Sequence, residues 1–149
     1  MARKVAFFEL RDVADTNRDK GRLYKLTEMP ATQAELWAAR AFLGMANAGT
    51  DIPEDVQNMG MAGLARYSLS MIAQLRFDDA RSLMEEMFGC VEFVPDPSRR
   101  DFSRKLVESD IEEISTRLKI RMEVLKLHLD FFEAVASSIR TPATTEPTG

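Results

Sequence analysis

Histidine and cysteine are almost missing from this sequence, which has one of each among its 149 residues. The single cysteine, Cys90, excludes a disulfide within the chain and is typical of a protein from a reducing cytosol. The single histidine, His128, excludes a Ser-His-Asp triad and a metal site built from several histidines. We interpret both residues as structural: Cys90 as a small buried hydrophobe, and His128 as a partly exposed residue within a helix.

Long apolar runs and an excess of positive charge are also missing. No run approaches the roughly 18 residues that a membrane-spanning helix needs, and no signal-peptide core follows Lys4. The formal net charge of −4 argues against a nucleic-acid-binding domain. Apolar residues make up 45% and charged residues 30%, as in a globular domain with a real core. The sequence therefore predicts a soluble intracellular protein that binds neither membrane nor nucleic acid.

Two charged clusters and one glycine pair are the candidates for chemistry. The acidic cluster consists of Asp110, Glu112 and Glu113. The basic cluster consists of Arg99, Arg100, Arg104 and Lys105. We interpret the first as the stabilising negative charge of a helix start rather than a metal site, and the second as a solvated surface rather than a phosphate site. The glycines of residues 60–63 lack the lysine of a P-loop. We therefore expect no enzyme, no cofactor and no metal.

The predicted fold class is mainly α. It is a small helical domain with an N-terminal β-hairpin and one long C-terminal amphipathic helix. The domain covers residues 1–140, with the hairpin as an arm at residues 1–30 and the long helix at residues 109–139. Residues 141–149, which are rich in threonine and proline, are expected to form a disordered tail.

Strand formers, turn residues and helix caps place the elements along the chain. Strand-forming runs at residues 5–10 and 22–26 flank a polar, turn-rich segment and predict the hairpin. Weaker runs at residues 90–94 and 102–107 are compatible with a second hairpin. Helices are expected over about 32–48, 53–75, 78–88 and 109–138, with capping boxes at Thr32 with Glu35 and at Ser109 with Glu112.

The first helix and the methionines leave two alternatives open. That helix is apolar on nearly every side, so it is either central to a core or covered by a partner. Five methionines gather in one third of the chain: Met59, Met61, Met71, Met84 and Met87. They fit ordinary core filling, or a surface that accepts varied partners.

Several motifs carry a family resemblance. Residues 26–35 read Leu-Thr-Glu-Met-Pro-Ala-Thr-Gln-Ala-Glu and are followed by Trp37-Ala38 and Arg40-Ala41. Further matching motifs are Ala48-Gly49-Thr50-Asp51-Ile52-Pro53, Gly60-Met61-Ala62-Gly63-Leu64, Asp110-Ile111-Glu112-Glu113-Ile114 and Thr116-Arg117-Leu118. Together they resemble the tail assembly chaperones of long-tailed bacteriophages and prophages, over roughly residues 23–130.

The resemblance implies a non-catalytic protein of the host cytoplasm that is absent from the mature virion. Such chaperones coat the tape measure protein during tail-tube assembly and keep it soluble. They also help to recruit the tail tube protein, in many phages through a longer, frameshifted form. We further expect a homo-oligomer. The alternative is a small phage-encoded regulatory or host-inhibiting adaptor without catalysis, which would be equally helical and acidic.

The last helix carries two apolar seams. The first consists of Ile111, Leu118, Met122, Leu125, Leu129 and Phe132. The second consists of Ile120, Val124, Leu127, Phe131 and Ala134. Two residues of separation turn a helix by roughly 200°, so the seams face nearly opposite ways. We expect the first seam to pack into the domain, and the second to bind a neighbouring subunit or the tape measure protein.

Overall fold

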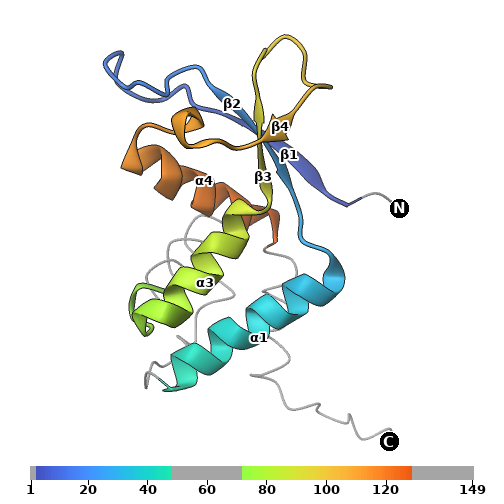
Figure 1. The fold of residues 1–149 in the computed structure, drawn as a ribbon, viewed down its shortest axis with the longest axis vertical. Helices are drawn as coiled ribbons and strands as arrows, with labels where there is room; N and C mark the ends of the chain where they lie inside the picture. Colours follow the sequence, from blue (N-terminus) through green and yellow to red (C-terminus); the bar gives the residue numbers. More distant parts are fainter. Residues whose placement is uncertain (1–2, 48–71, 129–149) are drawn as a thin grey trace, which may run out of the picture.

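Four strands, three α-helices and one short 3-10 helix are found in the part of the chain that the computed structural model describes, residues 3–47 and 72–128. In chain order they are β1 (Val5–Glu9), β2 (Leu23–Thr27), α1 (Ala31–Asn47), α3 (Phe77–Phe88), β3 (Val91–Val94), β4 (Arg104–Lys105), the 3-10 helix η2 (Glu108–Asp110) and α4 (Ile114–Leu127). The strands form one antiparallel sheet in the order β1-β2-β3-β4 (Figure 1).

The fold is therefore α+β, and the prediction of a mainly α domain is wrong. Both expected hairpins are present, as β1–β2 and β3–β4. In addition, β2 and β3 pair with each other, with Leu23 opposite Val94 and Leu26 opposite Val91. This pairing joins the two hairpins into a single four-stranded sheet.

Side chains alternate between the two faces of the sheet, and helices cover one of them. The other face is exposed at Val5 and Phe7 but buried at Leu23 and Val94, which are each 1% exposed. On β2, Tyr24 and Leu26 belong to the core cluster and are fully buried. On the opposite face, Lys25 is paired with Phe7 of β1. Phe7 is partly exposed, and the guanidinium carbon of Arg100 lies 5.0 Å from its ring centroid.

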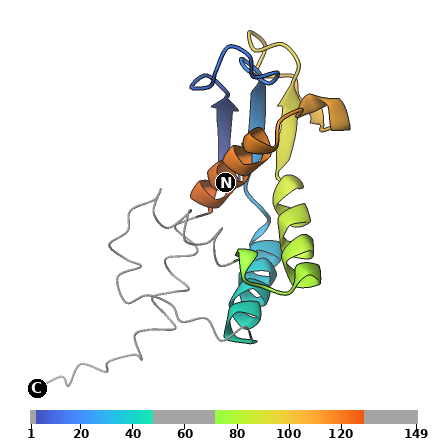
Figure 2. The same cartoon turned by 90° about the vertical axis from the view of Figure 1, so that its left-hand side faces the viewer.

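The core lies between the covered face of the sheet and the helices. Helix α4 crosses that face, whereas α1 and α3 lie side by side beyond the end of the sheet (Figures 1 and 2). Ile120 and Val124 of α4 join Tyr24 and Leu26 in one hydrophobic cluster. The indole N–H of the buried Trp37 donates to the Leu83 carbonyl over 2.9 Å, which ties α1 to α3.

Two of the expected helices are found close to their predicted limits. Helix α1 starts at Ala31, so Thr32 lies inside the helix rather than at its cap. Helix α3 starts one residue before the predicted Asp78 and ends at Phe88 as expected. The helix predicted over residues 53–75 falls outside the described residues, except for residues 72–75. The predicted tail at residues 141–149 also falls outside them.

Helix α4 begins later than expected. The capping box of Ser109 with Glu112 predicts a start at residue 109, but Ser109 belongs to η2, and α4 begins at Ile114. Between the two helices, Ile111 and Glu113 have extended backbone conformations. The end of the predicted helix, beyond residue 128, lies outside the described residues.

The predicted faces of α4 are only partly right, since Leu125 of the first seam lies in the core as expected but other positions do not follow the prediction. Ile120 and Val124, expected on the partner-binding seam, are 0% and 1% exposed, whereas Leu118, expected inside, is 51% exposed. Leu127 is half-buried. Heptad spacing marks apolar stripes but does not say which stripe a sheet will cover. The other predicted partner-binding residues lie outside the described residues: Phe131 and Ala134.

Candidate interaction surface

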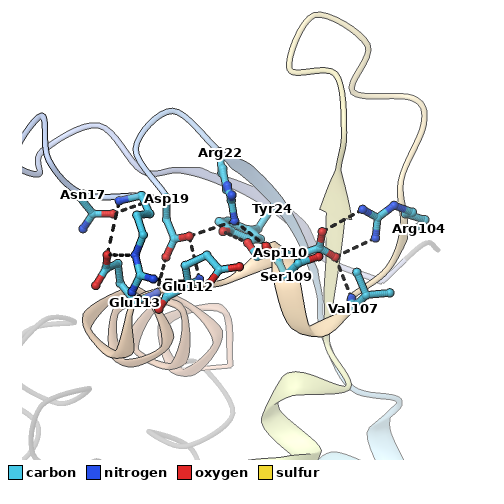
Figure 3. A network of polar contacts seen from close by, with 11 residues as sticks. Asn17, Asp19, Arg22, Tyr24, Arg104, Val107, Ser109, Asp110, Glu112 and Glu113 are labelled. Carbon is cyan, nitrogen blue, oxygen red and sulfur yellow. Dashed lines mark hydrogen bonds and ion pairs between the residues drawn. The ribbon is translucent and has the colours of Figure 1, made fainter.

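A buried carboxylate, that of Asp19, fixes the start of α4 (Figure 3). Asp19 is fully buried and accepts the backbone N–H groups of Glu112 over 2.8 Å and of Glu113 over 2.9 Å. Arg22 donates to the same carboxylate over 3.0 Å. Burial raises the pKa of Asp19, but these hydrogen bonds and the charge of Arg22 outweigh it, and the pKa lies below its ordinary value.

A second buried carboxylate, that of Asp110, holds β4 and η2 together. Arg104 donates to its two oxygens over 2.7 and 2.8 Å, and the N–H of Val107 donates over 2.7 Å. The backbone carbonyl of Asp110 accepts a hydrogen bond from the Tyr24 hydroxyl over 2.8 Å. Burial raises the pKa of this carboxyl, but the Arg104 and Val107 hydrogen bonds prevail and lower it overall.

The network of Figure 3 is therefore a structural clamp. Each of the four carboxylate oxygens of Asp19 and Asp110 accepts a hydrogen bond from the chain itself. Arg22, at the end of the β1–β2 loop, also donates to the Ser109 carbonyl over 2.9 Å, so its side chain connects Asp19 with the residue before Asp110. The network joins the β1–β2 loop, β4, η2 and α4, and its donors and acceptors satisfy one another.

One surface with exposed apolar side chains lies along the outer side of α1, beside α3. Leu36 and Leu43 stand seven residues apart on the outer side of α1 and are 58% and 64% exposed. Between them, Arg40 donates to the Ser82 hydroxyl of α3 over 2.9 Å and forms an ion pair with Glu86. We call this surface, formed by Leu36, Arg40, Leu43, Ser82 and Glu86, the α1–α3 groove.

The groove consists of two adjoining hollows. Leu36 lines the first and Leu43 lines the second, and both hollows share Arg40 and Ser82 as walls. The opposite side of α1 is buried, with Trp37 and Ala41 in the core cluster. The helix thus presents apolar side chains both to the core and to solvent.

Cys90 and His128, which the sequence analysis interpreted as structural residues, are both buried. Cys90 is a free thiol in the core, and burial raises its pKa to about 11. His128 was expected to be partly exposed within a helix, but it is buried and follows the last turn of α4. Its Nε2 accepts the N–H of Met29 over 2.8 Å, and its Nδ1 lies 2.8 Å from the Val124 carbonyl.

The charged clusters also have structural partners. Of the acidic residues, Asp110 pairs with Arg104, and Glu113 pairs with Arg18 over 2.7 Å. Among residues 3–47 and 72–128, no group of three His, Cys, Asp or Glu side chains could hold a metal ion. No helix in those ranges is long and apolar enough to cross a membrane. The glycines of residues 60–63 lie outside the described part of the chain.

Comparisons with protein-family models, with curated proteins and with solved structures find no match for this chain.

Sequence reasoning missed both the clamp and the groove. The sequence did contain a pattern that indicates the groove, because Leu36 and Leu43 are one heptad apart on a helix that is apolar on nearly every side. No pattern indicated the buried role of Asp19, because Asp19 beside Lys20 and Gly21 is typical of an ordinary turn.

Proposed function

We propose that this chain is a tail assembly chaperone of a long-tailed bacteriophage and that it binds the tape measure protein in the α1–α3 groove. The observation that carries the proposal is the pair of exposed leucines, Leu36 and Leu43, on α1. Leu36 lies within residues 26–41, the segment with the most specific resemblance to these chaperones, and Leu43 lies just beyond it.

The chemistry of the groove suits a chaperone for an apolar client. Each leucine that a client covers contributes about 1.5–3 kcal/mol, so two of them can hold a reversible complex. The ion pair of Arg40 with Glu86 lies between them and keeps the free surface hydrated. The formal net charge of −4 also favours solubility of the complex.

The proposal includes three further features that the resemblance implies. The chaperone acts in the host cytoplasm and is absent from the mature virion. A longer, frameshifted form recruits the tail tube protein. Copies of the chain associate with one another while they coat the tape measure protein.

The test is co-expression with the cognate tape measure protein. We expect a soluble complex that survives purification, and loss of that complex in the double variant Leu36→Asp with Leu43→Asp. Since both leucines are exposed, the double variant should melt within a few degrees of the wild type. Phe102→Asp is the matched control, because Phe102 is also exposed, at 56%, and lies in the β3–β4 connection, far from α1 (Figure 1).

Three results would count against the proposal. The tape measure protein could be equally soluble alone, or no complex could survive purification, and either result would favour the adaptor hypothesis. If the double variant bound as well as Phe102→Asp, the groove would be the wrong surface.

A further inference from the structure

Two arginines of α4 lie over one aromatic ring of α3. The guanidinium carbons of Arg117 and Arg121 are 4.1 and 4.7 Å from the ring centroid of Phe88. The arginines are four residues apart and so lie on one side of the helix, where like charges repel. The ring attracts each cation but does not neutralise it.

No carboxylate of the described residues pairs with either arginine. Other arginines of the chain have such partners, among them Arg18, Arg22, Arg40 and Arg104. Arg121 is nevertheless only 8% exposed, and its buried Nε–H has no hydrogen-bond acceptor among residues 3–47 and 72–128. A buried cationic donor without an acceptor is costly, and an oxyanion is the acceptor that fits a guanidinium best.

The pKa of Arg121 agrees with this geometry. Burial lowers it first, and the nearby charge of Arg117 lowers it further. No acidic group acts in the opposite direction.

Apolar side chains continue the same stripe of α4. Ile114 and Leu118 are 78% and 51% exposed and lie within one turn of Arg117. One turn beyond Arg121, Leu125 is already in the core. The stripe therefore combines two exposed aliphatic side chains with two unneutralised cations, of which Arg117 is partly buried and Arg121 is buried. We call it the α4 patch: Phe88, Ile114, Arg117, Leu118 and Arg121.

We propose that the α4 patch binds an acidic amphipathic helix of a protein partner. The partner's carboxylates pair with Arg117 and offset the buried charge of Arg121 beside it, and its apolar side chains cover Ile114 and Leu118. A free phosphate would satisfy the arginines but leave both aliphatic side chains in water. A protein segment covers the whole patch, so it is the occupant that the composition of the patch favours. The inference does not depend on the function of the α1–α3 groove.

The test uses the full chain and two synthetic helical peptides of about 20 residues. One peptide carries leucine and glutamate on a single face, and the other carries glutamine in place of each glutamate. By fluorescence anisotropy we expect the glutamate peptide to bind at least about tenfold more tightly, and its affinity to fall as salt rises. The Arg121 Nε–H resonance should shift with the glutamate peptide and stay unchanged with the glutamine peptide.

Matched variants assign the binding to the patch. Arg117→Gln should weaken the glutamate peptide about tenfold without loss of folding, since Arg117 is only partly buried. Leu118→Asp should weaken both peptides. Arg81→Gln is the control, because Arg81 is an exposed arginine of α3 that pairs with Glu85.

The proposal is overturned if the glutamate peptide does not bind, if both peptides bind equally, or if Arg117→Gln binds like Arg81→Gln. Complete displacement of the peptide by inorganic phosphate at an equal concentration would also overturn it, because the patch would then be a site for a free oxyanion.

Discussion

The carboxylate of Asp19 accepts the backbone N–H of Glu113 over 2.9 Å, although 94 positions separate the two residues. Glu113 is the residue that precedes the first turn of α4, where N–H groups have no acceptor within the helix. The β1–β2 loop thus supplies the cap of a helix at the other end of the described sequence. Position and stability of α4 depend on that loop.

Replacement of Asp19 by alanine should destabilise the protein by about 2–4 kcal/mol, because two backbone donors and Arg22 lose a buried acceptor. The measurement is urea unfolding followed by circular dichroism. Asp15→Ala in the same loop is the control, since Asp15 is 93% exposed and should change stability by less than about 0.5 kcal/mol. Equal stability of the two variants would show that the Asp19 cap contributes nothing.

Acidification should weaken the fold through His128. Its Nδ1–H donates to the Val124 carbonyl and its Nε2 accepts from Met29, which requires the neutral ring. Burial lowers the pKa of His128 below 6.5, so below pH 6.5 the unfolded chain binds a proton that the folded chain does not. Stability should therefore fall as pH drops from 6.5, by up to about 1.4 kcal/mol per pH unit, and His128 should contribute no pH dependence above 6.5.

The measurement is urea unfolding between pH 5 and pH 7.5, with His128→Phe as the variant that cannot titrate. The lowered pKa values of Asp19 and Asp110 place the loss of their contributions below pH 4, outside this range. A wild-type stability that stays flat from pH 6.5 to pH 5 would contradict the prediction.

The two sides of α4 should respond very differently to truncation. Ile120→Ala removes a fully buried side chain from the core and should cost about 2–4 kcal/mol. Leu118→Ala, on the exposed side, should cost less than about 1 kcal/mol in the free protein. Thermal melting measures both losses. Equal melting temperatures of the two variants would contradict the assignment of Ile120 to the core and of Leu118 to the surface.

Cys90 should be inert to alkylation in the folded protein. Its thiol is buried and its pKa of about 11 leaves almost no thiolate at pH 7.5. Iodoacetamide labelling, followed by mass spectrometry, should be slow for the native chain and fast in denaturant. Equal rates in the two conditions would mean that Cys90 is accessible.

Local patterns predicted the strands, but not the sheet. The runs at residues 5–10, 22–26 and 90–94 each match a strand, and β4 falls within residues 102–107. The pairing of Leu23 with Val94 left no local trace, because strand periodicity records which face is buried and not which strand lies alongside. The fold class was wrong for this reason.

Sequence reasoning also failed where a distant group competed with a local one. Ser109 with Glu112 has the spacing of a capping box, but Asp19 takes the N–H of Glu112 instead, and α4 starts five residues later. The seams of α4 show the same limit, because the sheet and not the spacing selects Ile120 and Val124 for the core.

The β2–β3 pairing has a consequence for the order of folding. Each hairpin closes over a short stretch of chain, whereas joining them requires Leu26 to meet Val91 across the whole of α1 and α3. Contacts of such high sequence separation are slow to form, so this step should set the folding rate. During synthesis, the first hairpin leaves the ribosome long before Ile120 and Val124, which complete its core. Its apolar face must therefore stay uncovered until nearly all of the described sequence has been made.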